Sequence, residues 1–315
     1  SSKIDYIQSK DNKTIKHIIS LQQRKFRQKY SEYIVEGVRA VTDIAKKGSL
    51  RSIFIRESKR NELEPMIQRE MNIPSIYVVQ DPIFDKIEHT VNGQGIIGIA
   101  KKRELNLQSF SIEDGLYIAL DGVQDPGNLG TIIRTAVAAG AKGIILLKGT
   151  VDPYNEKCVR STMSALSNIP IFEDITLSEF YDFVKDNDIS TYVTSLEDAK
   201  PYHSITYNPR TMIVLGNEGN GVSHDIIQLC DQAITIPMYG DIFGTIPVAE
   251  ALLAKGAQLG TILSFMMGVT TLSLPSIIML RKAVKPKLIW TFIVICAIGI
   301  VIVGYFFNKI QYLLV

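Results

Sequence analysis

Residues 121–134, DGVQDPGNLGTIIR, and residues 215–223, LGNEGNGVS, decide the fold of this chain. Each stretch directly follows a short apolar run and directly precedes a helix-like run. Glycines let backbone N–H groups approach a ligand closely, and open α/β sheets bind ligands in loops at the carboxyl ends of their strands. Two such turns in one part of the chain predict a shared ligand crevice.

Short apolar runs alternate with helical stretches on both sides of these turns. This alternation predicts an α/β fold with a mostly parallel sheet wrapped by helices. A helix is expected over residues 128–139, ended by Gly140, and Ser223 is expected to cap the helix after the second turn. The strands expected in this part are residues 116–120, 143–147, 191–194, 212–215 and 233–236.

Residues 1–105 carry a second, smaller α/β pattern. A basic helix is expected over residues 15–28. Its cationic side chains predict a basic face for an anionic partner, although an ordinary solvated helix surface explains the charges equally well. The polar stretch 101–114 is expected to be a linker. Strands are expected at residues 52–55, 75–79 and 95–100.

Composition sets broad limits on the class of protein. A chain of 315 residues has room for two or three domains, and a net charge of +2 does not by itself indicate a nucleic-acid binder. Cys158, Cys230 and Cys296 lie far apart without metal-ligand spacing, so neither a disulfide nor a metal site is expected. The first thirty residues are polar, so no cleavable signal peptide is expected and the amino-terminal part should lie in the cytosol.

The carboxyl-terminal part contains two long apolar runs. Residues 256–280 and 288–308 carry no charged side chain, and about 20 helical residues suffice to cross a bilayer core. The second run predicts a transmembrane helix. The first is diluted by glycine, serine, threonine and proline, so a re-entrant or broken helix is the alternative to a span.

Four basic residues lie between these runs and should stay cytoplasmic by the positive-inside rule. If both runs crossed the membrane, residues 1–255 would lie on the opposite side. Either the first run does not cross, or the chain joins two unrelated units through a fusion, rearrangement or assembly error. The basic residues are Arg281, Lys282, Lys285 and Lys287.

The two glycine turns resemble the SpoU/TrmH branch of the SPOUT superfamily. A third motif opens with IPMYG at residues 236–240 but does not continue into the family's Ser-Leu-Asn-like turn and closing helix. The resemblance implies S-adenosylmethionine-dependent methylation of a ribose 2′-hydroxyl in ribosomal or transfer RNA, a knotted fold and a homodimer. The first motif is matched by Asn128, Gly130 and Arg134, and the second by Gly216, Asn217, Glu218, Gly219 and Gly221.

The resemblance also implies a division into three parts. Residues 1–105, with YIVEG at residues 33–37, resemble an L30-like RNA-binding domain, and residues 115–241 resemble the methyltransferase domain. Residues 242–315, with FGTIPVAEALLAKG at residues 243–256, resemble the end of a bacterial predicted-permease family. That last resemblance implies a membrane location.

The residues that match the family motifs are assigned roles by the same resemblance. The catalytic candidates are Arg134, Asn128 and Glu218. The cofactor-binding candidates are Leu215, Gly216, Gly219, Ile236 and Met238. The RNA-binding candidates are Arg24, Lys25, Arg27 and Arg160.

Moving a methyl group from a sulfonium to a weakly acidic hydroxyl demands above all positioning. Arginine stays protonated near neutral pH, so Arg134 is expected to act electrostatically rather than as a general base. Glu218 is expected to orient Arg134 or the equivalent arginine of a partner subunit. The alternatives are a surface ion pair for Arg134, a helix N-cap for Asn128 and a solvated turn acid for Glu218. For Arg160 the alternative to a phosphate contact is an ordinary cation on a helix surface.

Three functions follow from these patterns. The first is an RNA 2′-O-ribose methyltransferase, impaired or not by the missing continuation of the third motif. The second is a catalytically inactive RNA-binding protein tethered to the membrane. The third is a permease subunit with a soluble extension, which predicts no affinity for RNA.

The apolar runs generate a prediction about solubility. A chain ending at Asp241 should give a higher soluble yield without detergent than the full chain, because it lacks both runs. The measurement is the soluble fraction of the two chains expressed side by side. Equal yields would contradict the prediction.

Overall fold

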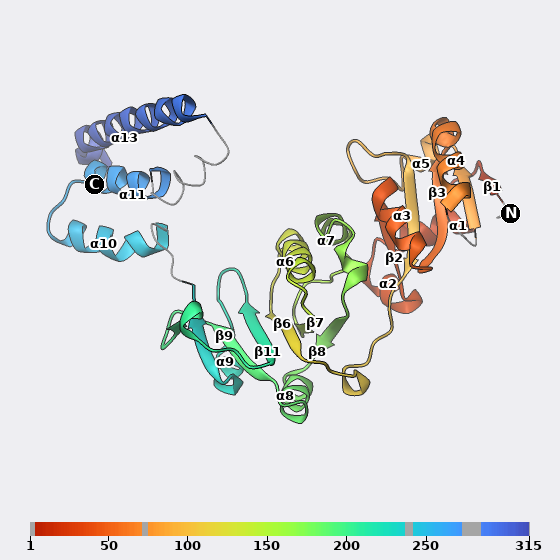
Figure 1. The fold of residues 1–315 in the computed structure, drawn as a ribbon. Coiled ribbons are helices and arrows are strands. Elements are labelled where there is room, and N and C mark those ends of the chain that lie inside the picture. Colours follow the sequence, from red (N-terminus) through yellow and green to blue (C-terminus); the bar gives the residue numbers. More distant parts are fainter. Residues whose placement is uncertain (1–3, 71–74, 237–241, 273–284, 315) are drawn as a thin grey trace. The chain divides into compact units, whose positions relative to one another are not determined.

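A computed structural model describes residues 4–70, 75–236, 242–272 and 285–314. The chain divides into two compact units, with the boundary between Thr235 and Ile236. The first unit contains two sheets and their covering helices, and the second contains helices (Figure 1).

The first sheet is mixed. Its strand order is β1-β4-β3-β5-β2, in which β1, β4 and β3 run parallel while β5 pairs antiparallel with both β3 and β2. The strands are β1 (Ile4–Ile7), β2 (Glu32–Glu36), β3 (Leu50–Arg56), β4 (Ser75–Val79) and β5 (Ile96–Lys101). The helices are α1 (Lys13–Ser20), α2 (Arg24–Tyr30), α3 (Val38–Lys46), α4 (Arg60–Glu70) and α5 (Asp81–Phe84), with a short 3₁₀ turn η1 (Glu57–Lys59).

The expected basic helix over residues 15–28 is wrong as a single element. The structure breaks it into α1 and α2 at residues 21–23. The guanidinium of Arg27 turns back and donates from Nη1 to the carbonyl oxygens of Leu21 and Gln22, at 2.9 and 2.8 Å. A side chain only five or six residues along therefore takes carbonyls that a continuous helix would bond internally.

The second sheet is entirely parallel, as expected from the alternating pattern. Its order is β10-β12-β9-β11-β6-β7-β8. The strands are β6 (Gly115–Asp121), β7 (Gly143–Leu147), β8 (Ile171–Ile175), β9 (Ser190–Thr194), β10 (Lys200–Pro201), β11 (Arg210–Gly216) and β12 (Gln232–Thr235). The helical elements are α6 (Pro126–Ala138), α7 (Glu156–Ser161), α8 (Leu177–Asp186), α9 (His224–Leu229), η2 (Leu107–Ser109), η3 (Ala165–Asn168) and η4 (Tyr202–Ser204). The sequence patterns missed β1, β2, β8 and β10.

Alternate residues of the central strands serve different cores. Ile118 and Leu120 of β6 belong to the cluster that contains residues of α6 and α7, whereas Tyr117 and Ala119 belong to the cluster of α8 and α9. The two-residue repeat of a strand sends successive side chains to opposite faces. Figure 1 shows α6 and α7 on one side of this sheet and α8 on the other.

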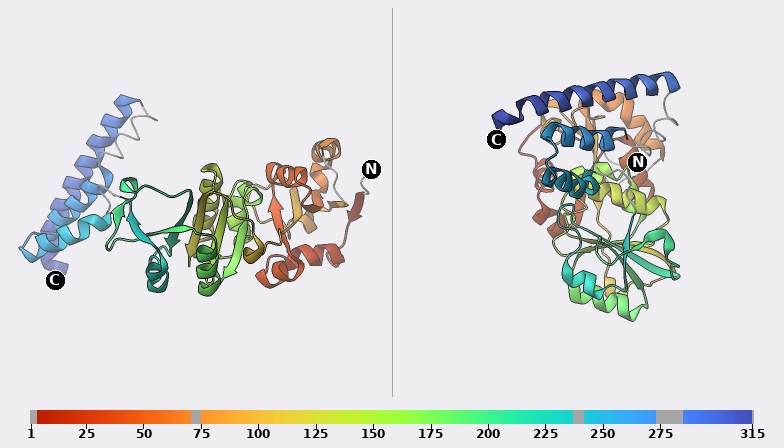
Figure 2. Two further views of the ribbon diagram at one scale, coloured as in Figure 1. Left: turned by 60° about the horizontal axis from the view of Figure 1, so that its bottom comes forward. Right: turned by 90° about the vertical axis from the view of Figure 1, so that its left-hand side faces the viewer.

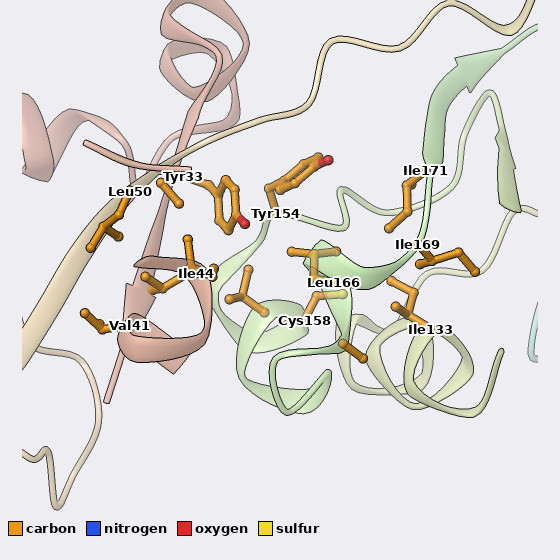
Figure 3. Close-up of a cluster of buried hydrophobic side chains, with 14 of the residues drawn as sticks. Tyr33, Val41, Ile44, Leu50, Ile133, Tyr154, Cys158, Leu166, Ile169 and Ile171 are labelled. Atoms are coloured by element: carbon orange, nitrogen blue, oxygen red, sulfur yellow. The ribbon is translucent and has the colours of Figure 1, made fainter. Parts of the chain in front are cut away.

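One buried cluster joins the two sheet layers of the first unit. Figure 3 shows Tyr33 and Tyr154 side by side, with their ring centroids 4.8 Å apart, between aliphatic side chains of both layers. Beside them, Arg27 donates from Nε and Nη2 to Oδ2 of Asp152, at 3.0 and 2.7 Å. Both ionic side chains are almost fully buried, so the pair holds the two layers together from inside.

The second unit contains α10 (Ile242–Ala254), α11 (Leu259–Thr271) and α13 (Pro286–Leu314). In the described ranges, one helix is long and apolar enough to cross a membrane, Pro286–Gln311, with a mean hydropathy of 2.6. The transmembrane prediction for residues 288–308 falls within it. The described part of the first apolar run forms α11, whose 13 residues are fewer than a span needs, and residues 273–280 lie outside the description.

Small residues let α11 and α13 pack closely, and the two helices lie next to each other in Figure 2. A Cβ atom on Gly260 would lie 2.0 Å from the carbonyl oxygen of Gly304, so neither position has room for a larger side chain without displacement. The Ser264 hydroxyl donates to the carbonyl oxygen of Ile300 at 3.0 Å. Such contacts are typical of helices that associate in an apolar environment.

The buried ion pair yields a prediction about stability. Arg27→Ala should lower the free energy of unfolding by about 3–5 kcal/mol, because it leaves the Asp152 carboxylate buried without its partner. The measurement is urea unfolding followed by near-ultraviolet circular dichroism of the tyrosines. Arg39→Ala is the matched control, because the Arg39 side chain is 85 % exposed and lies 4.0 Å from Asp43. Equal midpoints for the two variants would contradict the prediction.

Candidate functional site

The two glycine turns begin side by side at the carboxyl edge of the parallel sheet. Strands β6 and β11 are neighbours, and their register pairs Asp121 with Gly216. From β6 the chain proceeds to β7 and β8 on one side and then crosses to β9 on the other, so β6 and β11 flank the point where the strand order reverses. Open α/β sheets place ligand sites at this point.

A hydrogen bond from the second turn reaches the end of β6. The Ser223 amide donates to Oδ2 of Asp121 at 2.7 Å. Nearby, the Asn217 side chain donates from Nδ2 to the carbonyl oxygen of Gly122 at 2.8 Å. These two bonds hold the ends of the turns together.

The second turn is closed on itself around Asn217. The backbones of Asn217 and Gly221 exchange two hydrogen bonds of 2.9 Å, and the Asn217 side-chain oxygen accepts from the amides of Gly219 and Asn220. A Cβ atom on Gly216 would lie 2.1 Å from the carbonyl carbon of Gly221, whose φ is +69°. Glycine is therefore required at both positions, by close approach at the first and by backbone conformation at the second.

Glu218 links the second turn to the first. Its Oε2 accepts from the Gln124 amide at 3.1 Å, and its Oε1 accepts from the Asp125 amide at 3.1 Å and from Nδ2 of Asn128 at 3.2 Å. Hydrogen bonds from its own backbone amide, then from those of Asp125 and Gln124 and from the Asn128 side chain, lower the pKa of Glu218 to about 2. The carboxylate is consequently a fixed negative charge at the mouth of both turns.

Helix α6 begins two residues before the expected start at Asn128. Asp125 is its N-cap and accepts from the Asn128 amide at 2.9 Å, and Pro126 occupies the first helical position. The pKa of the exposed Asp125 carboxyl is lowered by that amide and by Lys157, whose Nζ lies 3.2 Å away. The interpretation of Asn128 as an N-cap is wrong, because Asp125 is the N-cap and Pro126 starts the helix two residues before Asn128.

Arg134 lies on the exposed face of α6. Its Nη1 is 3.0 Å from Sδ of Met163, and among the described residues it has no carboxylate partner. The carboxylate of Glu218 instead contacts Gln124, Asp125 and Asn128. The surface ion pair considered for Arg134 is therefore absent from the described part of the chain, and most of its donors are open to a ligand.

Gly130 explains how α7 comes close to this helix. A Cβ atom at this position would lie 2.4 Å from Cβ of Ser161 and 2.8 Å from the carbonyl oxygen of Cys158. The close crossing brings Arg160 of α7 and Met163 to the same side of the sheet as Arg134. Arg160 is 40 % exposed and lies 4.0 Å from Glu156.

The cofactor-binding candidates are only partly within the description. Leu215 and Gly216 end β11 and are half-buried, Gly219 is exposed on the turn, and Ile236 is 60 % exposed just past β12. Met238 lies outside the described residues. A cavity of about 790 Å³ is bounded by α8, β9 and the segment before β12, and it shares no residue with either turn.

The RNA-binding candidates separate into a buried one and exposed ones. Arg27 is 4 % exposed and paired with Asp152, which corrects the expectation that it contacts RNA. Arg24 is partly exposed and pairs with Asp174 at 3.1 Å, and Lys25 is exposed with its Nζ 4.8 Å from the Phe26 ring centroid. Charge clustering could not distinguish these cases, because the partner of Arg27 lies 125 positions away in the sequence.

Asp121, Gln124 and Asp125 also hold the site together, although the sequence patterns assign them no role. All three lie in the first turn. An aspartate at the end of a strand, and another directly before Pro126, are detectable signals for an anchor and an N-cap. The role of Gln124 depends on a backbone contact with Glu218 and left no such signal.

Comparisons with known proteins bear on each part of the chain. Residues 115–245 match the SpoU rRNA methylase family, and residues 12–98 match the MRM3-like substrate binding domain. Residues 206–309 match a predicted-permease family, which overlaps the methylase match.

Individual relatives cover most of the chain. The 23S rRNA (guanosine(2553)-2′-O)-methyltransferase of Bacillus subtilis (strain 168) is 30% identical over 251 residues, which is 78% of this chain and 96% of that protein. An AdoMet-bound rRNA methyltransferase from Sinorhizobium meliloti is 28% identical, with a TM-score of 0.66 and coverage of 75% of this chain and 89% of that one.

The SpoU methyltransferase AviRb from Streptomyces viridochromogenes, solved with AdoMet, is 22% identical with a TM-score of 0.66. It covers 72% of this chain and 89% of that one, and at this identity it shows the fold alone. With the Bacillus relative matched almost from end to end, this chain belongs to the SpoU rRNA methylase family.

Proposed function

We propose that the chain transfers a methyl group from S-adenosylmethionine to the ribose 2′-hydroxyl of ribosomal or transfer RNA. The single observation that carries the proposal is the Glu218 carboxylate, which ties both glycine turns and Asn128 together where the strand order reverses. The Bacillus relative is a 2′-O-methyltransferase of 23S rRNA, which supports the reaction. The Sinorhizobium structure is an rRNA methyltransferase with AdoMet bound, which supports the cofactor.

The backbone of the turns suits a cofactor that lies against it. The nearest atom to a Cβ built on Gly219 would be 3.6 Å away, and no atom lies within 4 Å of one on Gly221. With no side chain at either position, a ligand can approach the backbone of this turn closely. We assign cofactor binding to Leu215, Gly216, Gly219, Ile236 and Met238, and when bound the cofactor supplies an electrophilic methyl group on a sulfonium.

The protein's own residues then position the hydroxyl that receives the methyl group. Arg134, with most of its donors open, holds a phosphate or the ribose hydroxyl by charge-assisted hydrogen bonds. Its cation lowers the cost of losing the hydroxyl proton, which leaves to solvent. Asn128 and Glu218 keep the first turn in place, so that α6 presents Arg134 at a constant position.

Binding of the RNA extends beyond these turns. We assign phosphate contacts to Arg160, Arg24 and Lys25, which are all at least partly exposed, while Arg27 is excluded by burial. Residues 1–105 are proposed to bind the substrate, residues 115–241 to carry the reaction in a homodimer, and residues 242–315 to anchor this cytoplasmic enzyme to the membrane through α13.

A second candidate function is supported by the end of the parallel sheet. After the exposed Ile236, the chain continues into α10, α11 and α13 instead of the turn and helix that complete the family's third motif. A chain lacking that wall of the cofactor site would be a catalytically inactive RNA-binding protein tethered to the membrane. Cofactor binding distinguishes this candidate from the first.

Titration calorimetry tests the cofactor site directly. S-Adenosylmethionine added to the full chain in detergent should bind in the micromolar range, and Glu218→Ala should weaken binding by at least about tenfold, because it releases the first turn. Glu197→Ala, at an exposed acid outside both turns, is the control. The Glu218 pKa of about 2 lies below its ordinary value, so its stabilising effect is fully present above about pH 4.5 and is lost only as the pH falls toward 2.

The affinity should therefore not change through Glu218 between pH 5 and 8. A folded wild-type chain that binds no cofactor would leave the membrane-tethered RNA-binding protein as the better conclusion. Binding that survives in Glu218→Ala would remove Glu218 from the site.

Arg134 provides a separate kinetic test. Arg134→Ala should lower kcat for methyl transfer to RNA by roughly 10²–10³-fold, the usual cost of losing one charge-stabilising donor, and Arg134→Lys should recover part of it. Transfer of radiolabelled methyl groups to unmodified ribosomal RNA measures the rates. An unchanged kcat with a raised KM would instead mean that Arg134 contributes only to RNA binding.

A further inference from the structure

A second cavity, of about 490 Å³, opens in the first sheet layer, apart from both glycine turns. Helix α1 contributes to one wall, and the starts of β2, β3 and β4 with the end of β5 contribute to the others. Its volume falls in the range of small-ligand sites and is sufficient for a single nucleotide. Its lining includes the side chains of Lys13, His17, Glu32, Arg51, Tyr77 and Lys101.

The lining of this cleft is strongly cationic. Three Lys or Arg side chains face it, against one carboxylate. That carboxylate, Glu32, is almost fully buried and already engaged, because Arg51 Nε lies 2.8 Å from Oε1 and His17 Nε2 lies 2.6 Å from Oε2. Among the described residues, Lys13 and Lys101 have no ion-pair partner, so the cleft retains positive charge that an anion would neutralise.

The same cleft carries an aromatic surface. Tyr77 is half-buried, and its ring stacks on Phe54 with the centroids 5.2 Å apart and the planes 25° apart. The buried Phe54 fixes the position of that ring. Aromatic rings next to cations are the usual means of binding single-stranded RNA, in which a base can leave its neighbours and stack.

We propose that this cleft binds one unpaired nucleotide of the RNA substrate, with its phosphate near Lys13, Arg51 and Lys101 and its base against Tyr77. The proposal rests on the function proposed above and adds an RNA site distinct from Arg24, Lys25 and Arg160. A base within a duplex is already stacked on its neighbours, so it must leave its helix to stack on Tyr77. The site therefore selects single-stranded RNA.

Fluorescence anisotropy of a labelled oligouridine of about 12 nucleotides tests the cleft in the full chain. Lys13→Gln/Lys101→Gln should raise Kd roughly tenfold and reduce the slope of log Kd against log salt by about 1.4, about 0.7 for each lost phosphate contact. Lys10→Gln/Lys86→Gln removes the same charge from exposed lysines of the same layer and should leave both values nearly unchanged. Exposed substitutions of this kind change stability little, and thermal melts of both variants verify folding.

Three results would overturn the proposal that the cleft binds an unpaired nucleotide. They are equal Kd and salt slope for the two double variants, a wild-type affinity for a blunt RNA duplex equal to that for the oligouridine, or no binding of the oligouridine by the wild-type chain. Methyl-transfer assays distinguish this failure from failure of the proposed function. If Lys13→Gln/Lys101→Gln still transfers methyl groups with an unchanged KM for RNA, the proposed RNA site in the cleft is wrong and the proposed enzymatic function stands. If RNA binding depends on the cleft but no methyl group is transferred, the RNA site stands and the enzymatic function is wrong.

Discussion

The in-register pairing of β6 with β11 is the constraint on which the candidate site depends. It aligns Asp121 with Gly216, so that two turns separated by about ninety positions start from one edge of the sheet. Once they are adjacent, a single carboxylate can bond both, and Glu218 does so through two backbone amides and Asn128. The close contact of Gly216 with Gly221 fixes the shape of the second turn. The Asp125 cap fixes the start of α6, the helix that carries Arg134.

A second constraint joins the two sheet layers of the first unit. The pair of Arg27 with Asp152 and the packing of Tyr33 on Tyr154 form a buried joint between them. Burying two charges is costly unless both are fully bonded, and here Arg27 also satisfies two backbone carbonyls. The two layers are thereby connected through packed side chains rather than through the linker alone.

The carboxyl-terminal unit follows different physical rules. Helices α11 and α13 meet through glycines and a serine, and α13 exposes most of its apolar surface in the structure. Apolar exposure over a helix of this length suits a lipid environment better than water. The methylase match ends at residue 245 and the permease match begins at residue 206, so the two family patterns overlap where this unit begins.

The sequence by itself determined the alternation of strands and helices and the positions of the two glycine turns. Strand patterns placed β4 and β7 at their observed bounds, because buried parallel strands are written as short apolar runs between turns. Family motifs located Asn128, Arg134 and Glu218. Only the tertiary structure decided what Glu218 bonds, where α1 ends and why Arg27 is buried. Glu218 and Arg27 depend on partners 90 or more positions away, and the end of α1 depends on the direction in which that buried pair turns the Arg27 side chain. Local patterns carry no information about such partners.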